Sequence, residues 1–188
     1  MNKELHFLRT SLRSLRTTGS VTPSSPYLCR RIAQVIDADR PCVIAELGAG
    51  DGVITQYLLQ RMHPDSRLLV FEINPEFVDT LSKRFKDPRL ILIGDSAERL
   101  KEHCKRLSIE QLDYVVSAIP FVVLPADLRE RIVGVCKDQL REGGLFVQYH
   151  YSPLLLPAYR RIFGNMRLRL VARNIPPALL ITCVKGKS

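Results

Sequence analysis

Two acidic residues flank a run of glycines in a pattern typical of nucleotide binding. Glu46 ends a short apolar run and is followed by Gly48, Gly50 and Gly52, after which a helical pattern begins. Glycine permits a turn with unusual dihedral angles and lets a ligand approach the bare backbone. Glu72 ends the next apolar run, twenty residues after Gly52. From that place an acid can accept hydrogen bonds from both ribose hydroxyls.

The spacing narrows the choice of ligand. The motif is G-x-G-x-G rather than the G-x-G-x-x-G of dinucleotide-binding proteins, and no G-x-x-x-x-G-K-[ST] follows it. Glu46 places a negative charge beside the loop, which would repel a pyrophosphate but suit a cation. S-adenosylmethionine (AdoMet) has a ribose, an adenine, a sulfonium and an ammonium, and it has no phosphate. We therefore predict AdoMet as the ligand.

Two further turns follow apolar runs and carry polar groups. In Gly94-Asp95-Ser96, the Asp95 carboxylate could accept from an adenine amino group, or it could cap the helix predicted over 97–104. The turn Ser117-Ala118-Ile119-Pro120-Phe121 follows the fourth apolar run. Ligands of open α/β sheets bind at the carboxyl ends of the strands, so this turn is predicted to line the reaction site.

The elements that must position these residues alternate between strand and helix. Strands are predicted over 43–46, 67–72, 89–93, 112–117 and 145–151, and helices over 25–36, 53–61, 74–85, 97–104, 125–140 and 154–163. Glu142-Gly143-Gly144 is interpreted as the stop of the fifth of these helices. The strands 166–173 and 178–184 leave no room for a helix between them, so they form an antiparallel pair. The predicted fold is α/β, a Rossmann-like seven-stranded, mostly parallel sheet with a C-terminal antiparallel hairpin and helices on both faces.

Length and composition indicate one folded domain. The chain has 188 residues, of which 46% are hydrophobic and 25% charged. Its five cysteines are scattered and lack any C-x-x-C, which predicts reduced thiols and no metal site. Neither a secretory signal nor a membrane span stands out in the sequence, so we expect a cytoplasmic protein.

The net charge of +9 is concentrated in two segments. Residues 1–31 hold six Lys/Arg and one acid, and residues 143–188 hold seven Lys/Arg and no acid, whereas the segment between them has fifteen basic and eighteen acidic residues. A concentrated basic surface predicts an anionic partner, either a membrane or a nucleic acid.

The first 24 residues are interpreted as an appendage to a domain over 25–188. Residues 1–17 have leucines at helical spacing, flanked by Arg9, Arg13 and Arg16. This is typical of an amphipathic helix at an anionic lipid surface, although a helix packed on the domain has the same pattern. The Gly/Ser/Thr/Pro loop that follows contains Ser20, and it could fold over a ligand or serve as a linker.

Taken together, these stretches resemble the class I AdoMet-dependent methyltransferases, and more narrowly the bacterial phospholipid N-methyltransferases, which methylate phosphatidylethanolamine and ornithine lipids and are similar to the rRNA adenine dimethylases. The segments that carry the resemblance are 7–8, 18–25, 46–52, 72–75, 94–95, 117–121, 146–149 and 174–177. The chain departs from that family at Asp51 and His150, where threonine is common. The rRNA dimethylases begin the motif after the fourth strand with Asn, where this chain has Ser117.

The resemblance implies AdoMet-dependent methylation of the amine head group of a membrane lipid by a peripheral membrane enzyme. It implies a cofactor site made of Ser20, Glu46, Gly48, Ala49, Gly50, Gly52, Glu72, Ile73, Gly94, Asp95, Ser96, Ser117, Ala118 and Ile119. It implies catalytic roles for Ser117, Tyr149, His150 and Tyr151. The rings of the last three could relay a proton, hold a methylated ammonium or simply pack together. The alternatives are an RNA adenine N6-methyltransferase, a non-catalytic AdoMet-binding protein, and an enzyme that methylates a small soluble amine, which would leave the basic ends of the chain unexplained.

Overall fold

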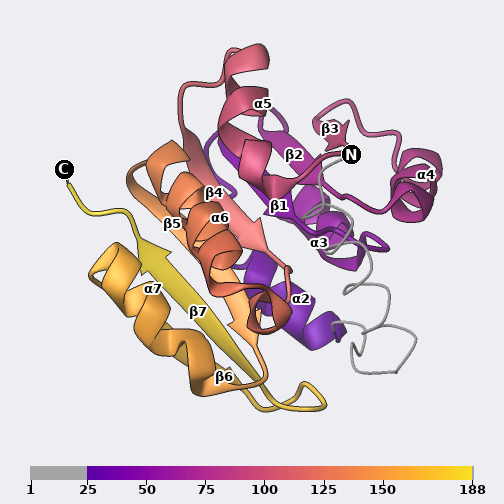
Figure 1. The fold of residues 1–188 in the computed structure, drawn as a ribbon. Coiled ribbons are helices and arrows are strands. Elements are labelled where there is room, and N and C mark those ends of the chain that lie inside the picture. The colour runs from indigo at the N-terminus through magenta and orange to yellow at the C-terminus, as the bar shows by residue number, and fades with distance from the viewer. Residues whose placement is uncertain (1–24, 188) are drawn as a thin grey trace.

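Seven strands form one twisted sheet in the computed structural model, which describes residues 25–187 (Figure 1). The strands are β1 (Val43–Leu47), β2 (Arg67–Phe71), β3 (Leu90–Ile93), β4 (Leu112–Ser117), β5 (Leu140–His150), β6 (Arg167–Val171) and β7 (Ala178–Val184). Their order is β3-β2-β1-β4-β5-β7-β6. The first five are parallel, and β7 lies antiparallel between β5 and β6. The predicted fold is confirmed.

Helices cover both faces of the sheet (Figure 1). They are α2 (Pro26–Ala33), α3 (Val53–Arg61), α4 (Pro75–Arg84), α5 (Leu100–Arg106), α6 (Ala126–Gln139) and α7 (Leu156–Phe163). One hydrophobic cluster joins α5, α6 and α7 to one face, and a second joins α2, α3 and α4 to the other. Because β1, β2 and β4 are covered on both faces, they are almost continuously apolar, as parallel strands usually are.

Two helices begin at caps that were visible in the sequence. The Ser25 hydroxyl accepts a hydrogen bond from the Leu28 N–H (3.2 Å), and Pro26 occupies the first turn of α2. Asn74 accepts from the Glu76 N–H (3.0 Å) and starts α4 in the same way. Helix α2 was expected to run to Ile36. It ends at Ala33, and the chain turns there towards β1.

The predicted helix stop at Glu142-Gly143-Gly144 is wrong. α6 ends at Gln139, and Leu140 already pairs with Leu112 of β4. Gly143 and Gly144 lie inside β5, at a shift of register against β4. Gly143 has φ +72°, and a Cβ on Gly144 would lie 2.9 Å from the Arg141 carbonyl oxygen. The two glycines therefore permit an irregular strand rather than ending a helix.

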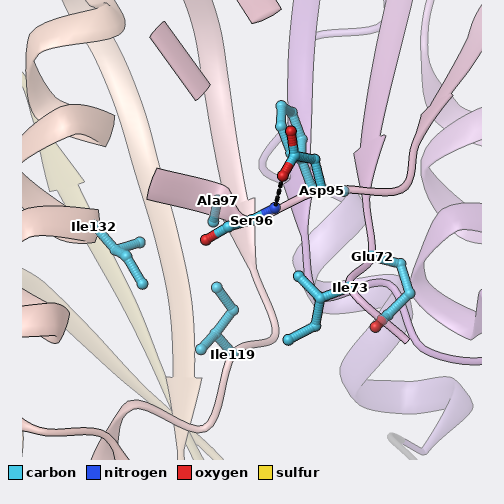
Figure 2. A pocket seen from close by; sticks show the side chains of 9 residues that line it. Glu72, Ile73, Asp95, Ser96, Ala97, Ile119 and Ile132 are labelled. Carbon is cyan, nitrogen blue, oxygen red and sulfur yellow. Dashed lines mark hydrogen bonds between the residues drawn. The ribbon is translucent and has the colours of Figure 1, made fainter. Parts of the chain in front are cut away.

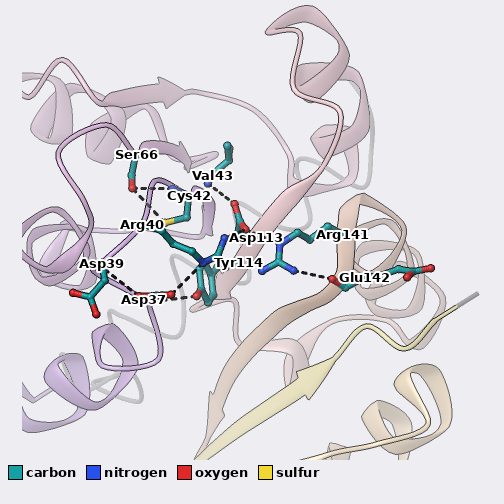
Figure 3. A network of polar contacts seen from close by, with 10 residues as sticks. All are labelled: Asp37, Asp39, Arg40, Cys42, Val43, Ser66, Asp113, Tyr114, Arg141 and Glu142. Atoms are coloured by element: carbon teal, nitrogen blue, oxygen red, sulfur yellow. Dashed lines mark hydrogen bonds and ion pairs between the residues drawn. The ribbon is translucent and has the colours of Figure 1, made fainter.

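A network of ion pairs ties the strands together at the amino edge of the sheet, away from the glycine loop (Figure 3). Asp113 accepts from Arg141 (2.7 Å), Arg40 (3.2 Å) and the Val43 N–H (2.9 Å). Although burial raises the pKa of Asp113, these bonds hold it below its usual range. The network thereby fixes the start of β1 and β4 relative to β5.

The N-terminal appendage lies outside the described residues, and so do its predicted helix over 1–17 and Ser20. Within residues 25–187, no helix combines the length and the apolar character that crossing a bilayer requires. The five cysteines are free thiols and are buried.

Candidate functional site

The glycine loop after β1 has backbone conformations that only glycine adopts easily. Gly48, Gly50 and Gly52 have φ values of +75°, +60° and +81°. A Cβ on Gly48 would lie 3.1 Å from the side chain of Ile119, and one on Gly52 would lie 2.5 Å from Phe85. The loop is thus packed against the turn after β4 on one side and against the region after α4 on the other. Ala49, whose side chain is buried, anchors its centre.

Glu72 is held at the carboxyl end of β2 by two backbone groups. Its Oε2 accepts from the Gly50 N–H (2.8 Å), and its Oε1 accepts from the Asn74 N–H (2.8 Å). A carboxylate has about four acceptor positions, so each oxygen can accept another hydrogen bond. The predicted ribose acceptor is therefore already oriented, and it connects the glycine loop to the start of α4.

A pocket opens between the glycine loop and the ends of β2, β3 and β4 (Figure 2). It is lined by Gly48, Phe71, Glu72, Ile73, Asp95, Ser96, Ala97, Ile119 and Ile132. Among these described lining residues there is no lysine or arginine, and the aliphatic side chains form a slot between two carboxylates. The pocket therefore suits an uncharged ring system with hydrogen-bond donors better than it suits a phosphate.

Three lining residues were not identified from the sequence: Phe71, Ala97 and Ile132. Phe71 and Ala97 directly adjoin predicted site residues. Ile132 belongs to α6, where its apolar type indicates only a core position, so no sequence signal marked it. Gly94, in contrast, was predicted but does not line the pocket; a Cβ there would face Val78 of α4.

Asp95 is fixed by hydrogen bonds at the end of β3. Its Oδ1 accepts from the Ser96 N–H (2.8 Å), and its Oδ2 lies 2.8 Å from Nε2 of His103 and 2.9 Å from Arg99. Burial raises the pKa of Asp95, but these partners lower it below its usual range overall. The alternative role as helix cap is wrong, because the Ser96 hydroxyl makes the capping bond to the Glu98 N–H (3.3 Å).

Glu46 is fully buried beneath the glycine loop. Within the described chain neither of its carboxylate oxygens has a hydrogen-bond partner, and the nearby Thr55 hydroxyl has none either. Burial raises the pKa of Glu46 to about 8, an effect that Thr55 opposes and the charge of Glu72 reinforces. The negative charge predicted beside the loop is therefore largely absent at neutral pH in the unliganded chain. Two unpartnered buried oxygens remain for a cationic or donor group.

The turn after β4 is stabilised by a hydrogen bond within the turn and by hydrogen bonds from a side chain of β5. The Ser117 hydroxyl accepts from the Ile119 N–H (3.3 Å), and both residues are buried. Gln148 donates through Nε2 to the Ile119 carbonyl oxygen (3.2 Å) and to that of Tyr149 (2.9 Å), whereas its Oε1 is buried without a partner in the described chain. Ala118 packs against the α2-side cluster. Gln148 thus supports the turn, a role that its position inside an apolar strand did not reveal.

The three aromatic residues at the end of β5 do not form one cluster. Tyr149 and Tyr151 meet edge to face, with ring centroids 5.9 Å apart. His150 points to the other face of the sheet, where Nε2 lies 2.7 Å from the Tyr159 hydroxyl of α7. Burial lowers the pKa of His150 to about 4, helped by the charge of Arg129, so this ring is neutral at pH 7. The two tyrosines therefore share one face of the sheet, and His150 lies on the other.

Comparison with known proteins decides the family. Residues 44–144 match the family described as a methyltransferase domain. The chain is a class I methyltransferase. The match begins in β1 and ends in β5, so it spans the glycine loop, Glu72, Asp95 and the turn after β4.

The proteins to which this methyltransferase is similar differ in how much of the chain they match. The ornithine lipid N-methyltransferase of Singulisphaera acidiphila is 34% identical over 167 residues, which are 88% of this chain and 87% of that protein. The ribosomal RNA small subunit methyltransferase A of Parabacteroides distasonis is 34% identical over 39% of this chain and 26% of that one. Among solved structures, the Burkholderia thailandensis 1,6-didemethyltoxoflavin-N1-methyltransferase with bound S-adenosylhomocysteine has a TM-score of 0.72 at 16% identity, covering 100% of this chain and 92% of that one.

The cofactor of the methyltransferase is AdoMet, and the site fits it. Three observations support the fit: a glycine loop in which a Cβ at Gly48 would be tightly placed against Ile119, a preoriented acceptor at Glu72, and an apolar slot between Ile73 and Ile119. The unpartnered oxygens of Glu46 lie under the same loop. AdoMet would bring an activated methyl group to the carboxyl edge of the sheet.

Proposed function

We propose that this methyltransferase transfers methyl groups to the amine head group of a membrane lipid of the ornithine lipid or phosphatidylethanolamine type. The observation that carries the proposal is the extent of the similarity to the ornithine lipid N-methyltransferase, 88% of one chain and 87% of the other. The similarity to the RNA methyltransferase covers 39% of this chain.

The chemistry requires positioning more than covalent help from the protein. Bound AdoMet supplies a methyl group on a sulfonium, which an amine lone pair can displace directly. The residues of the chain must hold that amine in line and exclude water. In this proposal, the turn Ser117-Ala118-Ile119 forms the wall beside the reacting atoms. Gln148 and the Ser117 hydroxyl keep that turn in place by their bonds to Ile119.

Tyr149 and Tyr151 are the residues that we assign to the amine. Their rings are perpendicular, at an interplanar angle of 75°, and they follow each other at the carboxyl end of β5. Such a pair can hold an ammonium by cation–π contact, and a phenolic oxygen can pass the proton of the amine to water. His150 contributes indirectly in this proposal, by fixing the end of β5 through its bond to Tyr159.

The basic N-terminal helix is proposed to hold the enzyme on the cytoplasmic membrane surface. Each basic residue near an anionic surface contributes about 1 kcal/mol, and the contribution falls with salt. Replacing Arg9, Arg13 and Arg16 by Gln should therefore weaken binding to anionic vesicles about a hundredfold at low salt and leave AdoMet affinity unchanged. Vesicle sedimentation and calorimetry measure the two quantities. Unaltered vesicle binding would refute this role.

The deciding experiment measures which class of molecule receives a labelled methyl group from AdoMet. The purified full chain is incubated with methyl-labelled AdoMet, total bacterial lipid and total RNA, and the mixture is then extracted into organic and aqueous phases. Label in the organic phase is the expected result, and chromatography of that phase identifies the head group. Label in RNA would replace the proposal with the RNA methyltransferase alternative. AdoMet binding without transfer to either would support the non-catalytic alternative.

A further inference from the structure

Two short segments at the carboxyl edge of the sheet expose apolar side chains. The first, Tyr151 to Leu154, joins β5 to α7, and the second, Ile175-Pro176-Pro177, joins β6 to β7 (Figure 1). Leu154 is 71% exposed and Ile175 is 83% exposed. We call these two segments the apolar rim. Exposed apolar side chains that are gathered at one edge indicate a surface that a partner covers.

The second segment of the rim is anchored to the body of the domain by Asn174. This buried side chain accepts from the Ser25 N–H (3.2 Å) and donates to the Pro176 carbonyl oxygen (2.6 Å). Ser25 is also the cap of α2, so the segment is fixed to the first turn of that helix. The exposed Ile175 is therefore presented by a held loop, and ordering it on a partner costs little conformational entropy.

Arginines stand near both segments of the rim along the chain. Arg173 stands two residues before Ile175, and it stacks over the Tyr27 ring at 5.5 Å, as Arg31 does at 5.2 Å. Arg160 follows Leu154 on the exposed side of α7. We call Arg31, Arg160 and Arg173 the arginine collar. Within residues 25–187 none of the three forms an ion pair.

We propose that the apolar rim and the arginine collar are the surface by which this domain docks on an anionic lipid bilayer. The rim would enter the boundary between head groups and acyl chains, and the collar would lie at the level of the phosphates. A collar of one sign beside an apolar edge matches the two layers of an anionic bilayer, charged head groups over acyl chains. The inference rests on the proposed function, because this edge also holds the reaction site.

Docking through the rim would give the enzyme a definite orientation. The carboxyl ends of β4 and β5 would face the bilayer, so a lipid amine could reach Tyr149 and Tyr151 without its acyl chains leaving the membrane. The basic residues of the N-terminal segment alone would attract the protein to the surface but would not fix which edge faces it.

The test compares two pairs of exposed apolar residues in the full chain. The rim variant is Leu154→Ser with Ile175→Ser. The matched control is Leu168→Ser with Leu170→Ser on the edge strand β6, where the two leucines are 47% and 62% exposed. Both variants keep the N-terminal arginines and should unfold at the wild-type urea concentration. We expect the rim variant to bind phosphatidylglycerol/phosphatidylcholine vesicles about tenfold more weakly than the wild type, because two buried aliphatic contacts are lost. The control should bind as the wild type does.

Equal vesicle binding by rim variant, control and wild type would overturn the inference, as would an equal loss in both variants. A rim variant that only abolishes self-association without lipid would identify the rim as a protein interface instead. A measurement of methyl transfer distinguishes failure of the docking proposal from failure of the proposed function. The rim variant should methylate a short-chain aminolipid below its micellar concentration at the wild-type rate, but methylate the same head group in vesicles about tenfold more slowly. A wild type that methylates neither form refutes the proposed function, while vesicle binding still decides the rim.

Discussion

The replacement Glu46→Gln tests whether the carboxyl group of Glu46 is protonated in the folded chain at neutral pH. Glu46 is fully buried, its oxygens have no hydrogen-bond partner in the described chain, and its pKa is raised to about 8. The groups that face it are Thr55 of α3, Cys29 of α2, Asp51 of the loop and Glu72 after β2. None of them is a cation, and the effect of Thr55 in favour of the ionised form is smaller than that of burial.

The expected pH dependence follows from the raised pKa. In the unfolded chain Glu46 ionises near its ordinary pKa of 4.5, whereas in the folded chain it stays protonated up to about 8. The resulting penalty is absent below pH 4.5, grows as the pH rises, and levels off above 8. It reaches about 1 kcal/mol at pH 5 and about 3 kcal/mol at pH 7. Gln cannot ionise, so Glu46→Gln should gain about 2 kcal/mol in stability relative to the wild type between these two pH values.

Urea unfolding of the AdoMet-free protein at pH 5, 6, 7 and 8 measures this difference. Burying the Gln amide changes the free energy of unfolding of the variant by the same amount at every pH. The test therefore rests on how the difference in stability between variant and wild type changes with pH. Glu110→Gln, which removes an exposed carboxylate, is the matched control and should run parallel to the wild type. If Glu46→Gln also runs parallel to the wild type, the carboxyl is ionised in the folded chain and the reasoning is refuted.

The same argument links cofactor binding to a proton. A cation at the loop favours the ionised carboxylate, so AdoMet binding at pH 7 should release nearly one proton from Glu46. Calorimetry in buffers of different ionisation enthalpy measures the release. It should disappear in Glu46→Gln, whose AdoMet affinity should also be weaker. A wild type that binds AdoMet with no proton release would show that the cofactor leaves Glu46 neutral.

Three further replacements test other parts of the structure. Glu72→Ala removes the preoriented acceptor and should weaken AdoMet binding at least about tenfold in calorimetry while the protein stays folded; retained affinity would exclude the ribose role. Gly48→Ala places a Cβ 3.1 Å from Ile119 at φ +75° and should weaken AdoMet binding roughly tenfold by strain, which an unchanged dissociation constant would contradict. Asp113→Asn should destabilise the protein by about 3 kcal/mol at pH 7. The pKa of Asp113 in the folded chain is lowered, so the loss of stability in Asp113→Asn is fully present above about pH 4. It becomes smaller as the pH falls through the folded pKa. Urea unfolding curves of variant and wild type that differ equally at every pH would contradict this prediction.

The sequence predicted the fold well because each strand and helix carried its own signal. Caps such as Ser25 and Asn74 are local, and so is the alternation of apolar runs with helical patterns that gives a parallel sheet. Errors arose where tertiary pairing overrode a local signal. Gly143-Gly144 is a good helix stop by itself, but pairing of Leu140 with Leu112 had already begun the strand.

The parts of the site that lie within one local motif could be predicted from the sequence. The parts formed by side chains from distant elements were harder to predict. The glycine loop and Glu72 lie where the motif indicated. The contribution of Ile132 required knowledge of how α6 crosses the sheet. His150 is different, because the alternation of side chains along a strand already places it opposite Tyr149 and Tyr151. Glu46 shows a third case: a residue type gives a charge, but burial decides whether that charge exists.

The described surface bears on the choice between lipid and RNA as the substrate. An RNA substrate would be held by arginines and lysines around the site, and its affinity would fall steeply with salt. At this edge the segment from Tyr149 to Tyr159 contains no Lys, Arg, Asp or Glu and includes the exposed Leu154, so the basic side chains there are those of the arginine collar beside it. Binding that persists on vesicles at high salt, after the N-terminal arginines are screened, would be carried by the apolar rim. Complete loss of vesicle binding at high salt would mean that charge alone holds the enzyme, and the apolar edge would then need another partner.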